Sequence, residues 1–180
     1  MRAAYADPPY LGMSEKFYGS MHPNARDYDK PEKHQELINM LCADFDAWAL
    51  SLHEPSLSTI LPMCPPDIRV AAWVKPFASF KKNVMRAWTW EPVIFRFGER
   101  KLPLGGTTWR DHIAENIAMK KGFQGAKPER FCFWVFEGLG LAPDDEFVDL
   151  FPGSGAVSAA WDKWAARESE FTLELFGDVG

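Results

Sequence analysis

Short apolar runs alternate with longer amphipathic segments along this 180-residue chain, and that alternation limits the folds open to it. Residues 68–74 (IRVAAWV) are almost continuously apolar, which is typical of a strand buried on both faces. Residues 31–45 instead carry Leu37, Leu41 and Phe45 four residues apart, the spacing of an amphipathic helix. Strands that alternate with helices favour a parallel sheet covered by helices, so the sequence predicts the α/β class.

Length and composition indicate one ordinary globular domain over residues 1–180. No apolar run reaches the roughly 18 residues of a membrane span, and no basic-then-apolar leader opens the chain, so we expect a cytoplasmic protein. The three cysteines (Cys42, Cys64 and Cys132) are odd in number and far apart, and the four histidines lack metal-ligand spacing. We therefore expect neither a disulfide framework nor a metal site.

The first ten residues, MRAAYADPPY, contain an apolar run that breaks at two consecutive prolines. Residues 3–6 predict a strand, whereas Pro8 and Pro9 cannot donate to a sheet ladder and keep the backbone extended. Asp7 and Tyr10 are thereby held on a stiff segment at the carboxyl end of that strand, where ligands bind in open α/β sheets. The pattern also fits an ordinary turn after an N-terminal strand, so on these residues alone both interpretations stay open.

A glycine-rich turn, residues 149–155 (DLFPGSG), lies between a predicted strand and a predicted helix over residues 156–166. Glycine suits such a turn because a ligand can approach its backbone closely. No lysine follows Gly155, so the turn is not a full phosphate-binding loop. Glu174 ends a predicted strand over residues 171–175, where such folds place a carboxylate for ribose hydroxyls. Together these features predict a site for a nucleoside-containing cofactor; an ordinary strand-to-helix turn is the alternative.

The two motifs, Asp7-Pro8-Pro9-Tyr10 and Phe151-Pro152-Gly153-Ser154-Gly155, resemble those of the amino-methyltransferases that modify N6 of adenine or N4 of cytosine. Members of that family use S-adenosylmethionine (SAM) on a Rossmann-like sheet. The order of the motifs, catalytic before cofactor, resembles the circularly permuted β-class of DNA methyltransferases and related RNA adenine methyltransferases. Lys127-Pro128 resembles the pair that opens a cofactor-contacting helix in the family, and Lys75-Pro76 resembles a feature at one of its strand ends.

The resemblance implies an α/β fold with a mostly parallel, circularly permuted sheet of about six strands. It decides the ambiguous segment 47–52 in favour of a strand, so the preceding helix should stop near Phe45. The expected strands are residues 3–6, 47–52, 68–74, 93–97, 147–150 and 171–175. We also expect the adenine side of the cofactor to be less covered than in the family, because the strand and helix that usually follow residue 174 are missing.

The resemblance further implies a role for each site residue. Asp7 and the Pro8 carbonyl would accept hydrogen bonds from the amino group of the target base, Pro9 would stiffen the corner, and Tyr10 would stack on the base. An aspartate in the first position of the motif favours adenine over cytosine. The residues expected to bind the cofactor are Asp149, Phe151, Gly153, Ser154, Gly155, Glu174, Lys127 and Pro128.

The net charge of −5 is unevenly divided along the chain. Residues 69–130 hold 13 Lys and Arg against 5 Asp and Glu, a net of +8, and the remainder holds 7 against 20, a net of −13. A basic middle can form a local positive face for nucleic acid, although it also fits solvated surface lysines. The candidate phosphate contacts are Lys81, Lys82, Arg86, Arg100, Lys101 and Arg110.

The expected function is thus methylation of adenine N6 in DNA, with RNA or cytosine N4 as alternative targets. Because the chain lacks room for a large recognition region, a homodimer partner or a separate subunit could supply target recognition. A catalytically silent methyltransferase-fold subunit that binds a partner is a second hypothesis. A nucleotide-binding oxidoreductase is a third, disfavoured because it leaves Asp7-Pro8-Pro9-Tyr10 unexplained.

Overall fold

The computed structural model describes residues 1–13, 25–77, 85–100, 108–118 and 126–176, and for residues 168–176 it describes the backbone alone. In chain order the elements are β1 (Arg2–Ala6), η1 (Ala25–Asp29), α2 (Pro31–Asp44), β2 (Ala47–Ser51), η2 (Glu54–Ser56), α3 (Leu57–Ile60), η3 (Leu61–Met63), β3 (Ile68–Val74), β4 (Trp90–Arg96), β5 (His112–Ala114), α4 (Glu129–Leu139), β6 (Glu146–Asp149) and α5 (Ala156–Phe176).

The six strands form one sheet in the order β5-β3-β4-β2-β1-β6. β1 pairs in parallel with β2 and β6, and β3 pairs in parallel with β5. β4 runs antiparallel to both of its neighbours, β2 and β3, so the other five strands all point the same way. The expected mostly parallel α/β sheet is confirmed, and the ambiguous segment after α2 is a strand, Ala47–Ser51.

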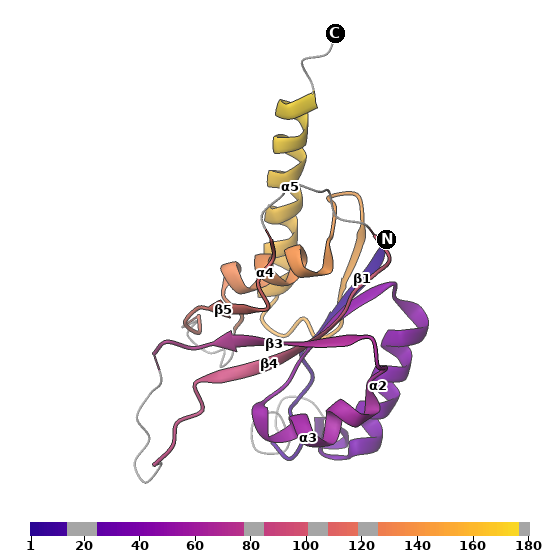
Figure 1. The fold of residues 1–180 in the computed structure, drawn as a ribbon, viewed down its shortest axis with the longest axis vertical. Coiled ribbons are helices and arrows are strands. Elements are labelled where there is room, and N and C mark those ends of the chain that lie inside the picture. The colour runs from indigo at the N-terminus through magenta and orange to yellow at the C-terminus, as the bar shows by residue number, and fades with distance from the viewer. Residues whose placement is uncertain (14–24, 78–84, 101–107, 119–125, 177–180) are drawn as a thin grey trace.

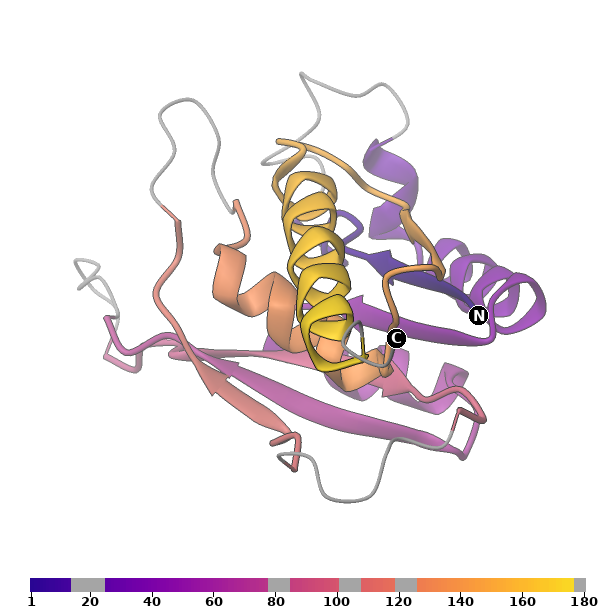
Figure 2. The same ribbon diagram turned by 90° about the horizontal axis from the view of Figure 1, so that it is seen from above.

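Helices cover both faces of the sheet: α4 and α5 lie on one face, and α2 and α3 lie on the other (Figures 1 and 2). Side chains that alternate along β1 divide between the two layers. Ala3 and Tyr5 belong to the core on the α4 and α5 side, whereas Ala4 and Ala6 belong to the core on the α2 side. Burial on both faces explains why β1 and β2 are almost wholly apolar.

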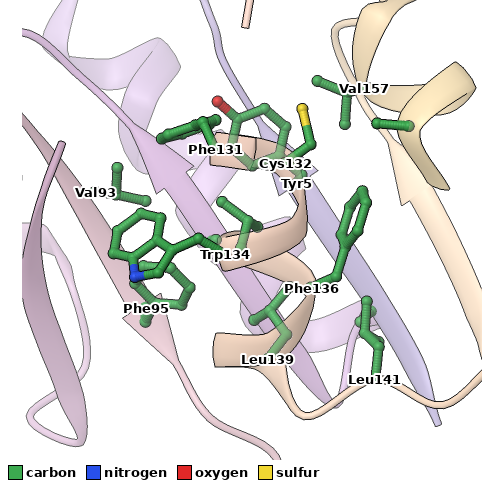
Figure 3. Packing of buried hydrophobic residues seen from close by; sticks show 14 of the residues in the cluster. Tyr5, Val93, Phe95, Phe131, Cys132, Trp134, Phe136, Leu139, Leu141 and Val157 are labelled. Atoms are coloured by element: carbon green, nitrogen blue, oxygen red, sulfur yellow. The ribbon is translucent and has the colours of Figure 1, made fainter. Parts of the chain in front are cut away.

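The core under α4 is built largely from aromatic side chains (Figure 3). Phe131 packs edge-on against Tyr5, with ring centroids 6.1 Å apart, and Trp134 stacks on Trp109 at 5.4 Å. Gly138 allows Trp109 to approach α4, because a Cβ at this position would stand 2.7 Å from Cε2 of Trp109. These contacts hold α4 firmly against the sheet.

The prediction of a strand over residues 171–175 is wrong, since these residues are the last turns of α5. The preceding residues 167–170 (RESE) contain no glycine or proline, so nothing ends the helix expected over 156–166. The sixth strand is instead β5, His112–Ala114, at the edge of the sheet. Within the described residues, no helix is long and apolar enough to cross a membrane.

Candidate active site

One edge of the sheet gathers the polar residues that the sequence scatters over the chain. The carboxyl ends of β1, β2, β3 and β6 meet there with the beginning of the antiparallel strand β4. This edge therefore receives Asp7 after β1, His53 after β2, Lys75 after β3, Glu91 at the start of β4 and Phe151 after β6. It is the edge at which ligands bind in open α/β sheets.

Asp7 forms an ion pair with Lys127 at the centre of this edge. Nζ of Lys127 lies 3.0 Å from Oδ1 of Asp7, and the lysine side chain is only 5% exposed. A proline follows each of the two residues and disfavours helical dihedral angles for them, so both backbones are held extended. Pro8 is buried and Pro128 is the N-cap of α4. The sequence thus restricts the backbone conformation at both residues of the ion pair.

Glu91 and Lys75 extend the ion pair into an alternating cluster of two carboxylates and two ammonium groups. Oε2 of Glu91 lies 4.0 Å from Nζ of Lys127, and Oε1 of Glu91 pairs with Nζ of Lys75. Both ammonium groups also lie over the Trp73 ring, at 4.6 Å for Lys75 and 5.2 Å for Lys127. Because the opposite charges balance, the cluster is tolerated although its side chains are largely buried.

Tyr10 joins the cluster through its hydroxyl group. The hydroxyl oxygen lies 3.3 Å from Oδ1 of Asp7 and 3.2 Å from Oε2 of Glu91, so its one proton can be donated to either carboxylate. Lys127 lies 3.5 Å away as a donor to the same oxygen. The Tyr10 ring stacks on His53, with centroids 5.3 Å apart and planes 11° from parallel. Tyr10 is therefore held by contacts at both its hydroxyl and its ring.

The buried setting alters the protonation of the cluster. Burial raises the pKa of the Asp7 carboxyl above its ordinary value, the Lys127 ammonium opposes that rise, and the Glu91 charge adds to it. Burial, followed by the charges of Asp7 and Glu91, raises the pKa of Tyr10 well above its ordinary value. Tyr10 consequently stays protonated at neutral pH and acts as a donor.

His53 presents a defined tautomer beside the Tyr10 ring. The Ser56 hydroxyl donates to the His53 carbonyl at 2.9 Å, and Nδ1 of His53 lies 2.9 Å from the same hydroxyl oxygen. Since the hydroxyl proton is used on the carbonyl, Nδ1 must carry the ring proton and donate it to Ser56. Burial lowers the pKa of His53, which favours the neutral ring. In that form Nε2 is a hydrogen-bond acceptor.

The glycine-rich turn follows β6, the strand next to β1. The amide of Leu150 donates to the Tyr5 carbonyl at 3.0 Å, which ties the turn to the strand that carries Asp7. Gly153 and Gly155 have φ values of +43° and +70°, which L side chains rarely adopt. A Cβ at Gly155 would meet no protein atom within 4 Å, so open space lies beside this backbone. The half-buried Ser154 lies between the two glycines.

Asp149, the last residue of β6, supports the turn. Oδ1 of Asp149 accepts from the Phe151 amide and Oδ2 from the Ser158 hydroxyl, each at 3.3 Å. Burial raises the pKa of Asp149, with a smaller contribution from the charge of Asp7. Phe151 packs its ring edge-on against Tyr28 at 5.5 Å. The turn and the Asp7 corner are therefore neighbours.

Comparison with known proteins finds resemblance in structure alone. No family model and no curated protein matches the sequence. The crystal structure of the M1.HpyAVI–SAM complex matches with a TM-score of 0.59 at 15% identity, over 91% of this chain and 78% of that chain. TTHA0409 of Thermus thermophilus, provisionally assigned as a DNA modification methylase, matches with a TM-score of 0.53 at 14% identity, over 98% of this chain and 86% of that one. The chain has a DNA methyltransferase-like fold.

Several predicted residues do not join the site in this methyltransferase-like fold. Glu174 lies in α5 and not at the end of a strand, so the structural premise for its ribose contact is lost. Arg100 pairs with Asp145, just before β6 at the opposite edge, with Nη1 to Oδ2 at 2.5 Å. Arg110 precedes β5 and so lies toward that opposite edge as well. Arg86 is exposed and close to the start of β4, whereas Lys81, Lys82 and Lys101 lie outside the described residues.

Sequence reasoning missed two residues that complete the site of this methyltransferase-like fold. Glu91 begins an antiparallel strand, so it reaches the Asp7 edge from the opposite chain direction, which only the strand order reveals. A single histidine after a strand carries no metal-ligand spacing, so nothing in the sequence marks His53. For Glu91, the one available signal in the sequence was its place as a charged residue at the start of an apolar run, residues 91–97.

Proposed function

We propose that this protein is a SAM-dependent methyltransferase that modifies the exocyclic amino group of a base in nucleic acid, with adenine N6 in DNA as the target. The observation that carries the proposal is the ion pair between Asp7 and the buried Lys127, beside the glycine-rich turn after β6. Asp7, which can bind an amino group, and the glycine-rich turn, which can bind a cofactor, thus follow the neighbouring strands β1 and β6. The circular permutation implied by the order of the motifs is part of the proposal.

The residues present fit a SAM site. Open space beside Gly155 gives room for a ligand close to the backbone, and positive φ angles at Gly153 and Gly155 favour glycine there. Asp149, Phe151 and Ser154 lie on the same turn and would hold the cofactor with them. Pro128 is the N-cap of α4, and Lys127, which precedes it, reaches Asp7, so we assign Lys127 to the amine side of the site.

In the proposed reaction, this chain orients a weak nucleophile. The lone pair of an aromatic amino group is delocalised into the ring, so hydrogen bonds from its two N–H groups to acceptors draw it toward a more nucleophilic geometry. Asp7 supplies one acceptor and the Pro8 carbonyl the other. Lys127 and Tyr10 both contact Oδ1 of Asp7, so Oδ2 is the oxygen assigned to the substrate. Positioning supplies most of the rate enhancement.

SAM supplies an electrophilic methyl group on a sulfonium, whose sulfur keeps the bonding electron pair when the methyl leaves. The amino nitrogen forms the new N–C bond, and its surplus proton passes to the Asp7 carboxylate and then to solvent. Tyr10 would stack on the extruded base, an interaction worth about 1–3 kcal/mol per base. That contribution offsets much of the few kcal/mol needed to unstack the base.

The test is transfer of a labelled methyl group from SAM to unmethylated DNA by the purified protein. We expect transfer by the native protein and a loss of about 100-fold or more in Asp7→Ala and Asp7→Asn, since both remove the anionic acceptor. Each variant is compared with the native protein for its SAM affinity, which should be retained. The melting temperature is measured as well and should fall in both variants, because Asp7 no longer balances the charge of the buried Lys127. No transfer to DNA, or equal transfer by Asp7→Ala, would contradict the proposal.

A silent methyltransferase-fold subunit is the second candidate, favoured by the contacts that Tyr10 and Asp7 already make within the protein. His53 covers a face of the Tyr10 ring, and Lys127 engages Asp7, so groups needed for the reaction are held by the protein itself. Calorimetry with SAM separates the two candidates, because a silent subunit would not bind the cofactor by itself. In either case we propose a single domain, with a second copy or a recognition subunit supplying target selection.

A further inference from the structure

The three most exposed large apolar side chains among the described residues lie together on the connection between β3 and β4. We call its described segments, residues 75–77 and 85–89, the β3–β4 arm. Phe77 is 76% exposed, Met85 is 100% exposed and Trp88 is 64% exposed. Figure 1 shows the chain after β3 and before β4 extending away from the helices. Exposed apolar side chains gathered in one place are typical of a binding surface.

Charge indicates the kind of partner that this surface fits. In the sequence, residues 75–90 contain four basic side chains and no acidic one, although the whole chain carries a net charge of −5. Aromatic side chains interleaved with cations are the composition with which proteins hold unpaired nucleic acid: cations track phosphates and rings stack on bases.

The β3–β4 arm is anchored beside the candidate active site. The Lys75 amide donates to the Thr89 carbonyl at 2.7 Å, so the two segments leave the sheet as a pair. The Trp88 indole N–H donates to Oε2 of Glu54 at 3.2 Å. Glu54 directly follows His53, whose ring stacks on Tyr10. Trp88 therefore lies next to the corner at which a target base would lie, and Phe77, whose amide donates to Oδ1 of Asn116 at 3.0 Å, is anchored by the segment after β5.

We propose that the β3–β4 arm stacks Trp88 and Phe77 on bases that neighbour the target nucleotide, while Arg86 contacts phosphate. The inference deepens the proposed function, because it assigns nucleic acid with unpaired bases as the substrate class. Sequence selectivity from such stacking is low, since every base offers a ring face.

The test measures the affinity of the native protein and its variants for a short, fluorescein-labelled single-stranded DNA by anisotropy. We expect Trp88→Ala and Phe77→Ala each to weaken binding by about 10-fold, and Trp88→Phe to bind within about two-fold of the native protein, because stacking survives. Phe97→Ala is the matched control: Phe97 is 38% exposed and follows β4 at the opposite edge. Its affinity for the DNA should not change.

Two further readouts separate this inference from the proposed function. SAM affinity should be the same in all these variants, so weaker DNA binding cannot arise from a damaged cofactor site. DNA binding through the arm without methyl transfer would leave the inference standing while the proposed function fails. Unchanged DNA affinity in both alanine variants would overturn the inference. So would a native dimer that Trp88→Ala converts to monomers by light scattering, since the arm would then bind a second copy.

Discussion

Lys127, two residues before α4, places Nζ 3.0 Å from Oδ1 of Asp7, the residue after β1. The lysine side chain is 5% exposed and the aspartate side chain is 26% exposed. Oε2 of Glu91 lies 4.0 Å from the same Nζ. The ionisation of Asp7 is therefore under opposing influences: Lys127 favours its charged form, whereas burial and Glu91 disfavour it. This arrangement makes the pH dependence of activity a sensitive probe of the site.

We expect kcat/KM for methyl transfer to fall on the acid side at a pH above the ordinary pKa of an aspartate. Asp7 must be ionised to accept from the substrate amine, and burial raises its pKa, so activity is lost as the pH falls through that raised value. Rates of methyl transfer, measured at subsaturating DNA across the acid pH range, define the acid limb of the pH profile of kcat/KM. An acid limb at the pKa of an ordinary exposed aspartate would contradict this assignment.

Two variants should move that limb in opposite directions. Lys127→Met removes the cation that favours ionised Asp7, so the limb moves to higher pH; Glu91→Gln removes a repelling carboxylate, so the limb moves to lower pH. The pair controls for general damage, because a loosened site would shift both limbs in the same direction. The measurement is the same pH profile for each protein, normalised to its own maximum rate.

Gly155→Ala should weaken SAM binding by about 10-fold or more, because the new methyl group would occupy open space assigned to the cofactor. Gly12→Ala is its matched control: Gly12 also has a positive φ, +76°, and a Cβ there meets nothing within 4 Å. Both variants carry a similar backbone cost of about 1–2 kcal/mol. Calorimetry with SAM should separate them, and equal affinities for the two variants would count against the assigned cofactor turn.

Gly138→Ala should lower the free energy of unfolding by about 1–3 kcal/mol, because its Cβ would stand 2.7 Å from the Trp109 ring. Trp109→Phe removes the ring atoms that the Cβ would meet. In the Trp109→Phe background the same glycine change should therefore cost less, as urea denaturation of the four proteins would reveal. A cost that is equal in both backgrounds would indicate that Trp109 is not the obstacle.

Cys132 and Cys64 should resist alkylation in the native protein. Burial raises the pKa of Cys132 to about 12 and that of Cys64 to about 11. Little thiolate, the reactive form, is then present at pH 8. Mass spectrometry of iodoacetamide-treated protein should find both residues modified only after unfolding. Modification of Cys132 at the same rate before and after unfolding would show that the core around α4 opens readily.

Most of the fold was accessible from local patterns. The strand Ile68–Val74 and the helix Pro31–Asp44 were recognisable, the first from a continuous apolar run and the second from its helical spacing. The expected burial of that strand on both faces is wrong: only Ala71 and Trp73, which share one face, are buried, and Arg69 is exposed. The end of α5 was not, because Phe171, Leu173 and Leu175 alternate like a strand while the residues before them lack any helix-ending signal. The strand-like alternation of apolar residues was misleading there, because α5 continues through them.

The candidate site was accessible only in part, for a topological reason. Asp7 and the glycine turn follow strands, so their motifs could be paired through the rule that carboxyl ends meet at one edge. Glu91 reaches that edge from an antiparallel strand, and His53 reaches Tyr10 through a stack, so neither has a local signature. Arg100 was wrongly grouped with the candidate phosphate contacts, because a basic residue in the sequence does not reveal that it pairs with a distant carboxylate, here Asp145.

The most direct test of the central claim is nucleoside mass spectrometry of DNA from cells that express the native protein or Asp7→Asn. The account predicts N6-methyladenine above background with the native protein and none with Asp7→Asn at equal expression. Methylated cytosine instead of adenine, or a product confined to RNA, would contradict the assigned target. Background levels of every methylated base with both proteins would contradict the methyltransferase itself.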